Sequence, residues 1–223
     1  IETMFAAGQR GKRSIAVDLK SPEAGAVLER LFRWSDVVHH NSRVGLAEKL
    51  GYDEARVRTV NPGVVYSFAS GFGETGPRAR LAANDQLMQA LCGIEASQGG
   101  FEQPPRILVW GAMDAAGGWV AACGMLAGLY ARRRTGAGQS VSSSLFAAGM
   151  LLKSGAFVRG GTVVSGPVLN RDQTGYGAAY RIYRCKDDAW LALAVPDAEA
   201  WARLRVVTGV AGLPVDPPSL RTR

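Results

Sequence analysis

The fold is decided by residues 36–69, which read DVVHHNSRVGLAEKLGYDEARVRTVNPGVVYSFA. The apolar runs near the two ends of this stretch predict two buried strands, residues 36–38 and 64–69. Between them, the pattern indicates two helices, residues 45–50 and 52–60. Strands that alternate with helices in this way are typical of a parallel sheet in an α/β protein.

The same alternation continues on both sides of this stretch. Upstream, residues 14–19 read as a short buried strand, and Ser21-Pro22 as a helix start with the serine as N-cap. Downstream, the pattern predicts a helix over 85–96 and a strand-like run over 107–110. Asp114 then opens a long apolar helix that closes at Arg134-Thr135-Gly136, followed by a strand, or the lead-in to a helix, over 139–143 and a helix over 145–153. We therefore expect an α/β fold with a Rossmann-like parallel sheet flanked by helices.

The C-terminal third predicts the beginning of a second, smaller domain. Residues 180–195 alternate like a hairpin with a polar turn at 186–188. The expected organisation is a large α/β domain over residues 1–153, incomplete at its N-terminus, a glycine-rich linker over 154–178, and the start of the small domain over 179–223. Because the chain starts without methionine and in mid-domain, we expect it to be a truncated part of a longer protein.

Composition excludes several classes of site. The 223 residues are 47% hydrophobic and 20% charged, which is ordinary globular composition. Cys92, Cys123 and Cys185 lie far apart, and His39 and His40 are the only histidines. This sparse set predicts neither a metal site nor a disulfide framework, and it fits a reducing cytoplasm.

The net charge of +7 predicts an anionic partner. The basic residues are spread along the chain and no nucleic-acid-binding signature accompanies them, which favours a phosphorylated small molecule over a nucleic acid. The longest uncharged stretch, residues 115–131, is shorter than the ~20 apolar residues of a membrane span. We interpret it as a buried helix and expect no membrane partner.

Gly71-Phe-Gly-Glu-Thr-Gly76 matches the dinucleotide-binding pattern GxGxxG and follows a predicted strand. A nucleotide-binding loop should lead directly into a helix whose free N–H groups face the pyrophosphate. Here Pro77, Arg78 and Arg80 follow instead. A turn is therefore favoured over a dinucleotide loop.

Asp114 stands where an irregular segment becomes a long helix. It can be an N-cap, which is a common role for aspartate. It can also be a nucleophile, because a helix N-terminus favours the ionised carboxylate. Gly111, Gly117 and Gly118 would let a bulky ligand approach the backbone closely. The residues by themselves leave cap and nucleophile open.

Basic residues flank the first two predicted strands. Lys12, Arg13 and Lys20 surround the first, while Arg43 and Lys49 follow the second. Loops of adjacent parallel strands can converge on one edge of a sheet, where such a rim would suit phosphates. Solvated surface charge is the alternative. The run from Arg132 to Arg134 is interpreted as charge that satisfies a helix C-terminus.

Six segments, taken together, resemble the class III CoA-transferase (CaiB/BaiF) family. In order, they are Gly11-Lys-Arg-Ser-Ile-Ala-Val-Asp-Leu-Lys20, Asp36-Val-Val-His-His-Asn41, Lys49-Leu-Gly51, Asn61-Pro62, Gly71-Phe-Gly-Glu-Thr-Gly-Pro77 and Arg134-Thr-Gly-Ala-Gly-Gln139. The resemblance runs from Gly8 to about Val195. It implies an enzyme that moves coenzyme A from an acyl-CoA to a free carboxylate, through an aspartyl anhydride and an aspartyl–CoA thioester.

The resemblance also implies site residues. Asp114 matches the family's nucleophile, and Gly175 and Gly177 match a glycine loop that closes over the active site. Coenzyme A would meet Val17, Asp18, Leu19, Lys20, Asn41, Ser42, Arg43 and Lys49, and Ala82, Ala83, Asn84 and Asp85 would line the approach to Asp114. The implied partners are acyl-CoA and a carboxylic acid, with coenzyme A as a substrate and no tightly bound cofactor. The implied assembly is an interlocked cytoplasmic homodimer.

Two departures from the family pattern bear on function. Ser42 replaces an aromatic residue, which affects how adenine would pack. Asn84 stands where the related α-methylacyl-CoA racemases have a histidine base, and an amide cannot perform acid–base catalysis near neutral pH. A CoA-transferase is therefore favoured over a racemase or epimerase. A catalytically degenerate CoA-binding module is the third hypothesis.

Overall fold

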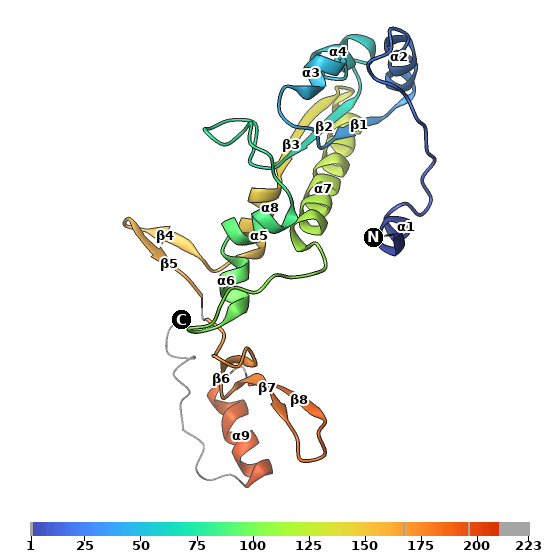
Figure 1. The fold of residues 1–223 in the computed structure, drawn as a ribbon. Helices are drawn as coiled ribbons and strands as arrows, with labels where there is room; N and C mark the ends of the chain where they lie inside the picture. Colours follow the sequence, from blue (N-terminus) through green and yellow to red (C-terminus); the bar gives the residue numbers. More distant parts are fainter. Residues whose placement is uncertain (1, 167, 196, 210–223) are drawn as a thin grey trace. The chain divides into compact units, whose positions relative to one another are not determined.

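The computed structural model describes residues 2–166, 168–195 and 197–209 (Figure 1). The helices are α1 (Glu2–Gly8), α2 (Ala24–Trp34), α3 (Leu46–Leu50), α4 (Glu54–Val60), α5 (Asp85–Leu91), α6 (Ile94–Gly99), α7 (Ala112–Thr135), α8 (Leu145–Leu152) and α9 (Ala198–Thr208). The strands are β1 (Val37–His40), β2 (Val65–Ser70), β3 (Gln139–Ser144), β4 (Phe157–Arg159), β5 (Thr162–Val164), β6 (Gly175–Gly177), β7 (Tyr180–Arg184) and β8 (Trp190–Ala194).

The described residues form two compact units. The first contains the residues up to Phe68 together with Ala121–Ser142, and the second contains Ala69–Val120 together with the residues from Ser143 onward. The chain therefore crosses between the units within β2, within α7 and within β3. The domain boundaries expected from the sequence remain a prediction.

The first unit is built around a sheet in the order β1-β2-β3. β1 and β2 are parallel, with Val37 opposite Val65 and His40 opposite Phe68. The core contains buried residues from α2, α4 and the strand region, namely Phe32, Val57, Val64 and Tyr66. The two strands and two short helices predicted from residues 36–69 are confirmed, with ends shifted by a few residues.

α7 lies close to this sheet because it carries glycines where it faces the strands. A Cβ atom at Gly124 would lie 2.5 Å from Val141 Cγ1, and one at Gly128 would lie 2.8 Å from Val65 Cγ1. Both distances are shorter than packed carbon atoms allow. Small residues at these two positions are therefore a packing requirement of the first unit.

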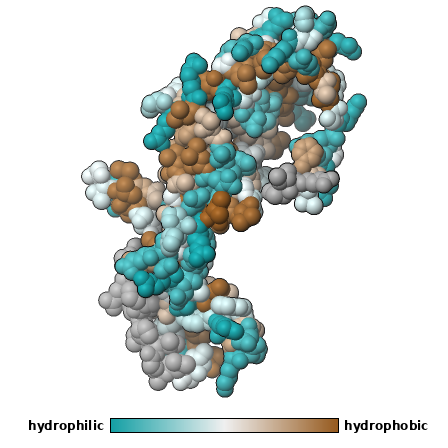
Figure 2. All heavy atoms as spheres, viewed as in Figure 1, coloured by the Kyte–Doolittle hydropathy of each residue, from teal (hydrophilic) through white to brown (hydrophobic). Residues whose placement is uncertain are grey.

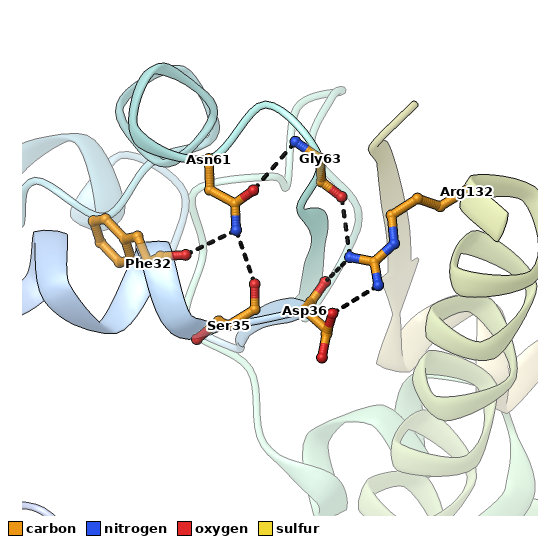
Figure 3. Close-up of polar contacts among 6 residues, drawn as sticks. All are labelled: Phe32, Ser35, Asp36, Asn61, Gly63 and Arg132. Atoms are coloured by element: carbon orange, nitrogen blue, oxygen red, sulfur yellow. Dashed lines mark hydrogen bonds and ion pairs between the residues drawn. The ribbon is translucent and has the colours of Figure 1, made fainter. Parts of the chain in front are cut away.

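Two polar side chains tie the loops of the first unit together (Figure 3). Asn61 Nδ2 donates to the carbonyls of Phe32 and Ser35, both at 2.9 Å, and its Oδ1 accepts from Gly63 N. Arg132 in the last turn of α7 donates to Gly63 O at 3.1 Å and to Asp36 Oδ1 at 2.7 Å. Arg132 thus holds loops far from it in sequence, a more specific role than the one expected for residues 132–134.

Two predicted strands are absent. Residues 14–19 are extended and largely exposed, with Ile15 at 64%, and they join no ladder among the described residues. Residues 107–110 are also irregular, and Val109 is 89% exposed. Both predictions were wrong for the same reason: β-branched and apolar residues favour a strand only where a partner strand supplies the hydrogen bonds.

Two helix boundaries also differ from the expectation. The helix predicted over residues 85–96 is divided into α5 and α6, because Gly93 has φ of 71° and interrupts the helical ladder. The helix expected to start at Ser21 starts at Ala24. The Ser21 hydroxyl bonds the amide and the side chain of Glu23 in a preceding turn, so it does not cap the helix.

The second unit has two apolar clusters. One is formed by Met88, Ala112 and Met113 where α5 meets the start of α7, and the other by Ala179, Val195 and Trp201 where α9 packs on the last hairpin. The predicted hairpin is confirmed, with β7 and β8 antiparallel. The segment expected to be irregular over residues 154–178 contains the hairpin β4–β5 and the short strand β6.

Apolar side chains remain exposed on several elements. Trp119, Leu126 and Tyr130 of α7 are each more than 60% exposed, as are Val158 and Val163 of the β4–β5 hairpin. Apolar surface is visible on the molecule in Figure 2. By length and composition alone α7 could cross a membrane. The expectation of a buried helix over residues 115–131 is wrong for much of its surface: α7 packs on the sheet through Gly124 and Gly128, but most of its apolar stretch is not buried.

Candidate active site

Asp114 is the third residue of α7, and it does not cap the helix. The capping group is Asp85, whose Oδ2 accepts from Met113 N at 2.7 Å and from Asp114 N at 2.9 Å. The carboxylate of Asp114 accepts no hydrogen bond within the described part of the chain. The N-cap reading of Asp114 is therefore wrong, because the carboxylate of Asp85 occupies the helix terminus; a role for Asp114 as nucleophile stays a prediction.

Asp85 is itself held in place at the first residue of α5. The side chain of Asn84 caps α5 by accepting from Leu87 N at 2.9 Å. One turn along the same face, Gln89 is fully buried and its Nε2 bonds the Oδ1 of Asp85. Residues four apart on a helix face each other, which explains the pairing of Asp85 with Gln89.

Gln89 also fixes the segment that leads into α7. Its Oε1 accepts from Leu108 N at 2.9 Å and its Nε2 donates to Leu108 O at 3.0 Å. One buried amide therefore satisfies both backbone groups of Leu108 in a segment that has no regular structure. Through Gln89 and Asp85, α5 positions both the approach to α7 and its first turn.

The packing beneath the first turn of α7 is tight. Met113 and Met88 are fully buried, and a Cβ atom at Gly149 would lie 2.9 Å from Met113 Sδ. Gly117, which was expected to admit a ligand, faces Leu145, whose Cδ2 would lie 2.6 Å from a Cβ atom there. Gly118 by contrast has open space around it. One of the two glycines is thus explained by packing.

Asp114 is an exposed residue, yet partial desolvation of its carboxyl beside the packed first turn raises its pKa above its ordinary value, and the negative charge of Asp85 raises it further. The sequence predicted the opposite tendency, because a helix N-terminus stabilises an ionised carboxylate. Here Asp85 takes the N–H groups of residues 113 and 114, so the partial positive charge of the terminus is largely neutralised. Desolvation and the charge of Asp85 thus both disfavour the ionised form of Asp114.

The glycine pattern at residues 71–76 forms a turn. Gly73 and Gly76 have φ of 99° and 92°, and a Cβ atom at Gly71 would overlap the Cβ of Ala83. The residues after Gly76 continue as turns, and α5 starts only at Asp85. The structure thus favours the turn reading, and the first glycine lets the predicted strip Ala82–Asp85 pack closely.

Ala82 and the two glycines predicted to form an active-site loop, Gly175 and Gly177, lie in different parts of the second unit. Ala82 is exposed, next to the packed Ala83. Gly175 and Gly177 lie in β6, paired with Arg181 and Tyr180 of β7, where a Cβ atom at Gly175 would overlap the carbonyl of Tyr180. Both glycines are therefore part of a short strand, and Gly175 meets a packing need there. Their role in an active-site loop remains a prediction.

The predicted nucleotide-binding residues belong to the first unit. Val17 lies in the irregular segment before a turn that starts at Asp18 and includes Leu19 and Lys20, in which Lys20 N donates to Asp18 Oδ1 at 3.0 Å. Asn41 and Arg43 are exposed directly after β1, and Lys49 is exposed on α3. The second unit separately brings Asp85 and Asp114 together. No group of three or more metal-ligating side chains occurs among the described residues.

Ser42 has a partner that the sequence did not indicate. Its hydroxyl lies 2.7 Å from that of Tyr52, and Tyr52 contacts the His40 ring edge-on. His40 in turn stacks on Phe68 and bonds the Tyr66 hydroxyl at 2.7 Å. An aromatic cluster therefore supports the loop after β1 at the position where Ser42 departs from the family pattern.

Comparison with known proteins gives a consistent result. The model of CoA-transferase family III matches residues 1–222. The chain is 30% identical to the acetyl-CoA:oxalate CoA-transferase of Acetobacter aceti, over 96% of this chain and 55% of that protein. It is 39% identical to the human alpha-methylacyl-CoA racemase, over 61% of this chain and 36% of that protein.

Solved structures support the fold. Rv3272 of Mycobacterium tuberculosis matches with a TM-score of 0.73 at 25% identity, over 90% of this chain and 52% of that chain. A CAIB/BAIF family protein of Brucella suis matches with a TM-score of 0.69 at 26% identity, over 92% of this chain and 54% of that chain. The predicted fold class is confirmed. The chain spans about half the length of these proteins and of the Acetobacter transferase.

Proposed function

The chain belongs to CoA-transferase family III, and from this premise we propose that it transfers coenzyme A from an acyl-CoA thioester to a free carboxylate with Asp114 as the nucleophile. The observation that carries the proposal is the arrangement at the start of α7. Asp85 takes the helix-capping role, and the carboxylate of Asp114 has a raised pKa and accepts no hydrogen bond from the residues that the structure describes. A basic carboxylate of this kind is suited to attack a thioester.

The proposed reaction proceeds through four exchanges at Asp114. The carboxylate attacks the thioester carbonyl and the carbon–sulfur bond breaks. CoA thiolate is the leaving group, and an acyl–aspartyl anhydride is formed. The thiolate then attacks the aspartyl carbonyl, which releases the donor acid and forms an aspartyl–CoA thioester. The acceptor carboxylate attacks this thioester, giving a new anhydride and CoA thiolate. Attack of the thiolate on the acceptor carbonyl yields the new acyl-CoA and regenerates Asp114.

Coenzyme A is a substrate in this scheme. The basic and polar residues that the family resemblance implies for its nucleotide, including Lys20, Asn41, Arg43 and Lys49, are proposed contacts. Three of them, Asn41, Arg43 and Lys49, are solvent-exposed near the C-terminal end of β1, where a phosphate could reach them. A homodimer, a cytoplasmic location and the absence of a tightly bound cofactor remain predictions.

The test is a search for the covalent intermediate. Incubation of the full-length protein with acetyl-CoA and no acceptor should leave an adduct on the peptide that contains Asp114, and hydroxylamine should cleave it. Asp114→Asn keeps the shape of the side chain but removes the nucleophile, so turnover should fall by about three orders of magnitude or more while CoA still binds. An adduct on Asp85, or substantial turnover by the variant, would refute the proposal.

A racemase is the second candidate, because the human racemase is among the similar proteins. Asn84 weighs against it. Its side chain caps α5, and an amide side chain does not act as a general acid or base near neutral pH. Incubation of a 2-methylacyl-CoA in deuterated water should therefore give no deuterium at the α-carbon. Deuterium incorporation would support the racemase instead.

A further inference from the structure

Asp85 faces protein donors with both of its carboxylate oxygens. Oδ2 accepts from two consecutive backbone amides, those of Met113 and Asp114, and Oδ1 accepts from Gln89. The side chain is thus engaged in holding α5 to the first turn of α7. This arrangement differs from the role that the family resemblance implies for Asp85, which is to line the approach of coenzyme A.

We propose that Asp85 is a positioning residue, which sets the place of the Asp114 carboxylate by anchoring the first turn of α7 through the amides of Met113 and Asp114. The proposal rests on the proposed function in so far as Asp114 is the nucleophile. One anchored amide belongs to Asp114 itself, so its backbone cannot shift without loss of a charge-assisted hydrogen bond. The fully buried Met113 fixes the turn from the other side.

Gln89 presents a hydrogen-bond donor to Asp85 in a fixed orientation. Its amide group is oriented by Leu108, because Nε2 must face Leu108 O and Oε1 must face Leu108 N. Asp85 therefore meets a donor from Gln89 and two donors from α7. A carboxylate accepts from all three, whereas an asparagine would have to turn its NH₂ group toward one of these donors. The site thus requires aspartate and not merely a residue of its shape.

Other ionisable groups on the neighbouring elements have different partners or surroundings. Lys153 at the end of α8 donates to Gly93 O and to Ser97. Burial raises the pKa of the Cys92 thiol, which favours its neutral form. Arg106, before α7, is exposed. Asp85 is the charged group that acts on the pKa of Asp114, so its removal should also be visible in the titration of Asp114.

The kinetic test uses Asp85→Asn and Asp85→Ala in the full-length protein with acetyl-CoA and oxalate. Displacement of a reacting group by about 1 Å can cost about 10²-fold in rate, so we expect kcat to fall about tenfold to a hundredfold, while KM for acetyl-CoA stays within about twofold. Asp197→Asn is the matched control, since Asp197 caps α9 by accepting from Ala200 N at 2.7 Å. It should leave kcat unchanged. A raised KM at unchanged kcat would overturn the proposal and make Asp85 a substrate contact.

A second readout does not depend on turnover. The Cγ resonance of Asp114 in protein labelled with ¹³C-aspartate, assigned with Asp114→Asn, reports its titration. In Asp85→Asn the pKa of Asp114 should fall, and the amides of Met113 and Asp114 should exchange with solvent faster. An unchanged titration and unchanged exchange in a folded variant would overturn the positioning role. If the wild type lacks transferase activity, the proposed function fails while this measurement still decides the role of Asp85.

Discussion

Asp85 and Asp114 are two carboxylates of one unit with opposite roles. Asp85 accepts hydrogen bonds from backbone amides, whereas Asp114 has a raised pKa and accepts no such bond within the described ranges of the chain. Ionised Asp114 is therefore less favourable in the folded protein than in the unfolded chain. A functional carboxylate in such surroundings is expected to lower stability, because it forgoes the interactions that a structural one would make.

This imbalance predicts how stability depends on pH. Between the ordinary aspartate pKa of 3.8 and the raised folded value, the folded protein binds more protons than the unfolded chain at Asp114. The contribution of Asp114 to the free energy of unfolding therefore falls as pH rises through that window. Asp114→Asn should be as stable as the wild type or slightly more stable at pH 7, with the difference vanishing below about pH 3.8.

Urea unfolding at both pH values measures this effect. Asp172→Asn, at an exposed aspartate of another loop, is the control and should leave stability unchanged. An acidic residue that merely favours the dipole of a helix N-terminus contributes about 0.3–1 kcal/mol. If Asp114→Asn lowers the free energy of unfolding by that amount at pH 7, Asp114 stabilises α7, contrary to the expectation.

α7 is anchored at both ends by polar contacts of different kinds. At its start, Asp85 binds two amides. At its end, Arg132 bridges the carbonyl of Gly63 and the side chain of Asp36 (Figure 3). The ion pair with Asp36 is weak in itself, because the Asp36 side chain is 76% exposed. The bonds to backbone carbonyls matter more, since they join loops that precede neighbouring strands.

Removal of the Arg132 contacts with Asp36 and Gly63, which we call the Arg132 latch, should destabilise the first unit. Arg132→Ala is expected to lower the free energy of unfolding by about 1–2 kcal/mol, because it removes hydrogen bonds to two main-chain carbonyls, those of Asp36 and Gly63. Arg132→Lys keeps the charge but lacks the planar guanidinium that donates to several acceptors at once. It should therefore recover less than half of the lost free energy of unfolding. Arg133→Ala, at the exposed neighbour, is the control and should stay within about 0.5 kcal/mol. Equal effects of the two alanine variants in denaturant unfolding would contradict the latch.

For the molecule as a whole, charge is the feature that bears on ligand binding. The net charge of +7 is spread over the chain, and Arg43 and Lys49 are exposed in the first unit near the end of β1. Under the proposed function, they would meet the phosphates of coenzyme A. Exposed charges act through a field that salt screens over about 8–10 Å.

The corresponding prediction concerns affinity. Arg43→Ala combined with Lys49→Ala should weaken CoA binding at least tenfold at low salt and flatten its dependence on ionic strength, without a change in acyl-chain preference. Calorimetry with coenzyme A measures this. Lys186→Ala, in the turn between β7 and β8, is a control of like charge and should leave affinity unchanged. Unaltered affinity in the double variant would remove these residues from the proposed site.

Sequence alone determined the elements whose stability is mainly local or whose apolar pattern is unambiguous. Residues 36–69 specify two strands and two short helices, and the alternation at 180–195 specifies a hairpin. The position of Asp114 at the start of a long helix was also predictable. Local capping and periodicity carry this information, because each depends on residues within a few positions of one another.

Tertiary structure alone decided which carboxylate caps α7. Asp85 and Asp114 are separated by 28 intervening residues, and no local rule says that Asp85 Oδ2 reaches the amides of Met113 and Asp114. Tertiary contacts also decided that residues 14–19 are not a strand, since a strand depends on a partner and not only on its own composition. The pKa of Asp114 follows from the same cause: a helix terminus predicts a lowered value, but burial and the charge of Asp85 reverse it.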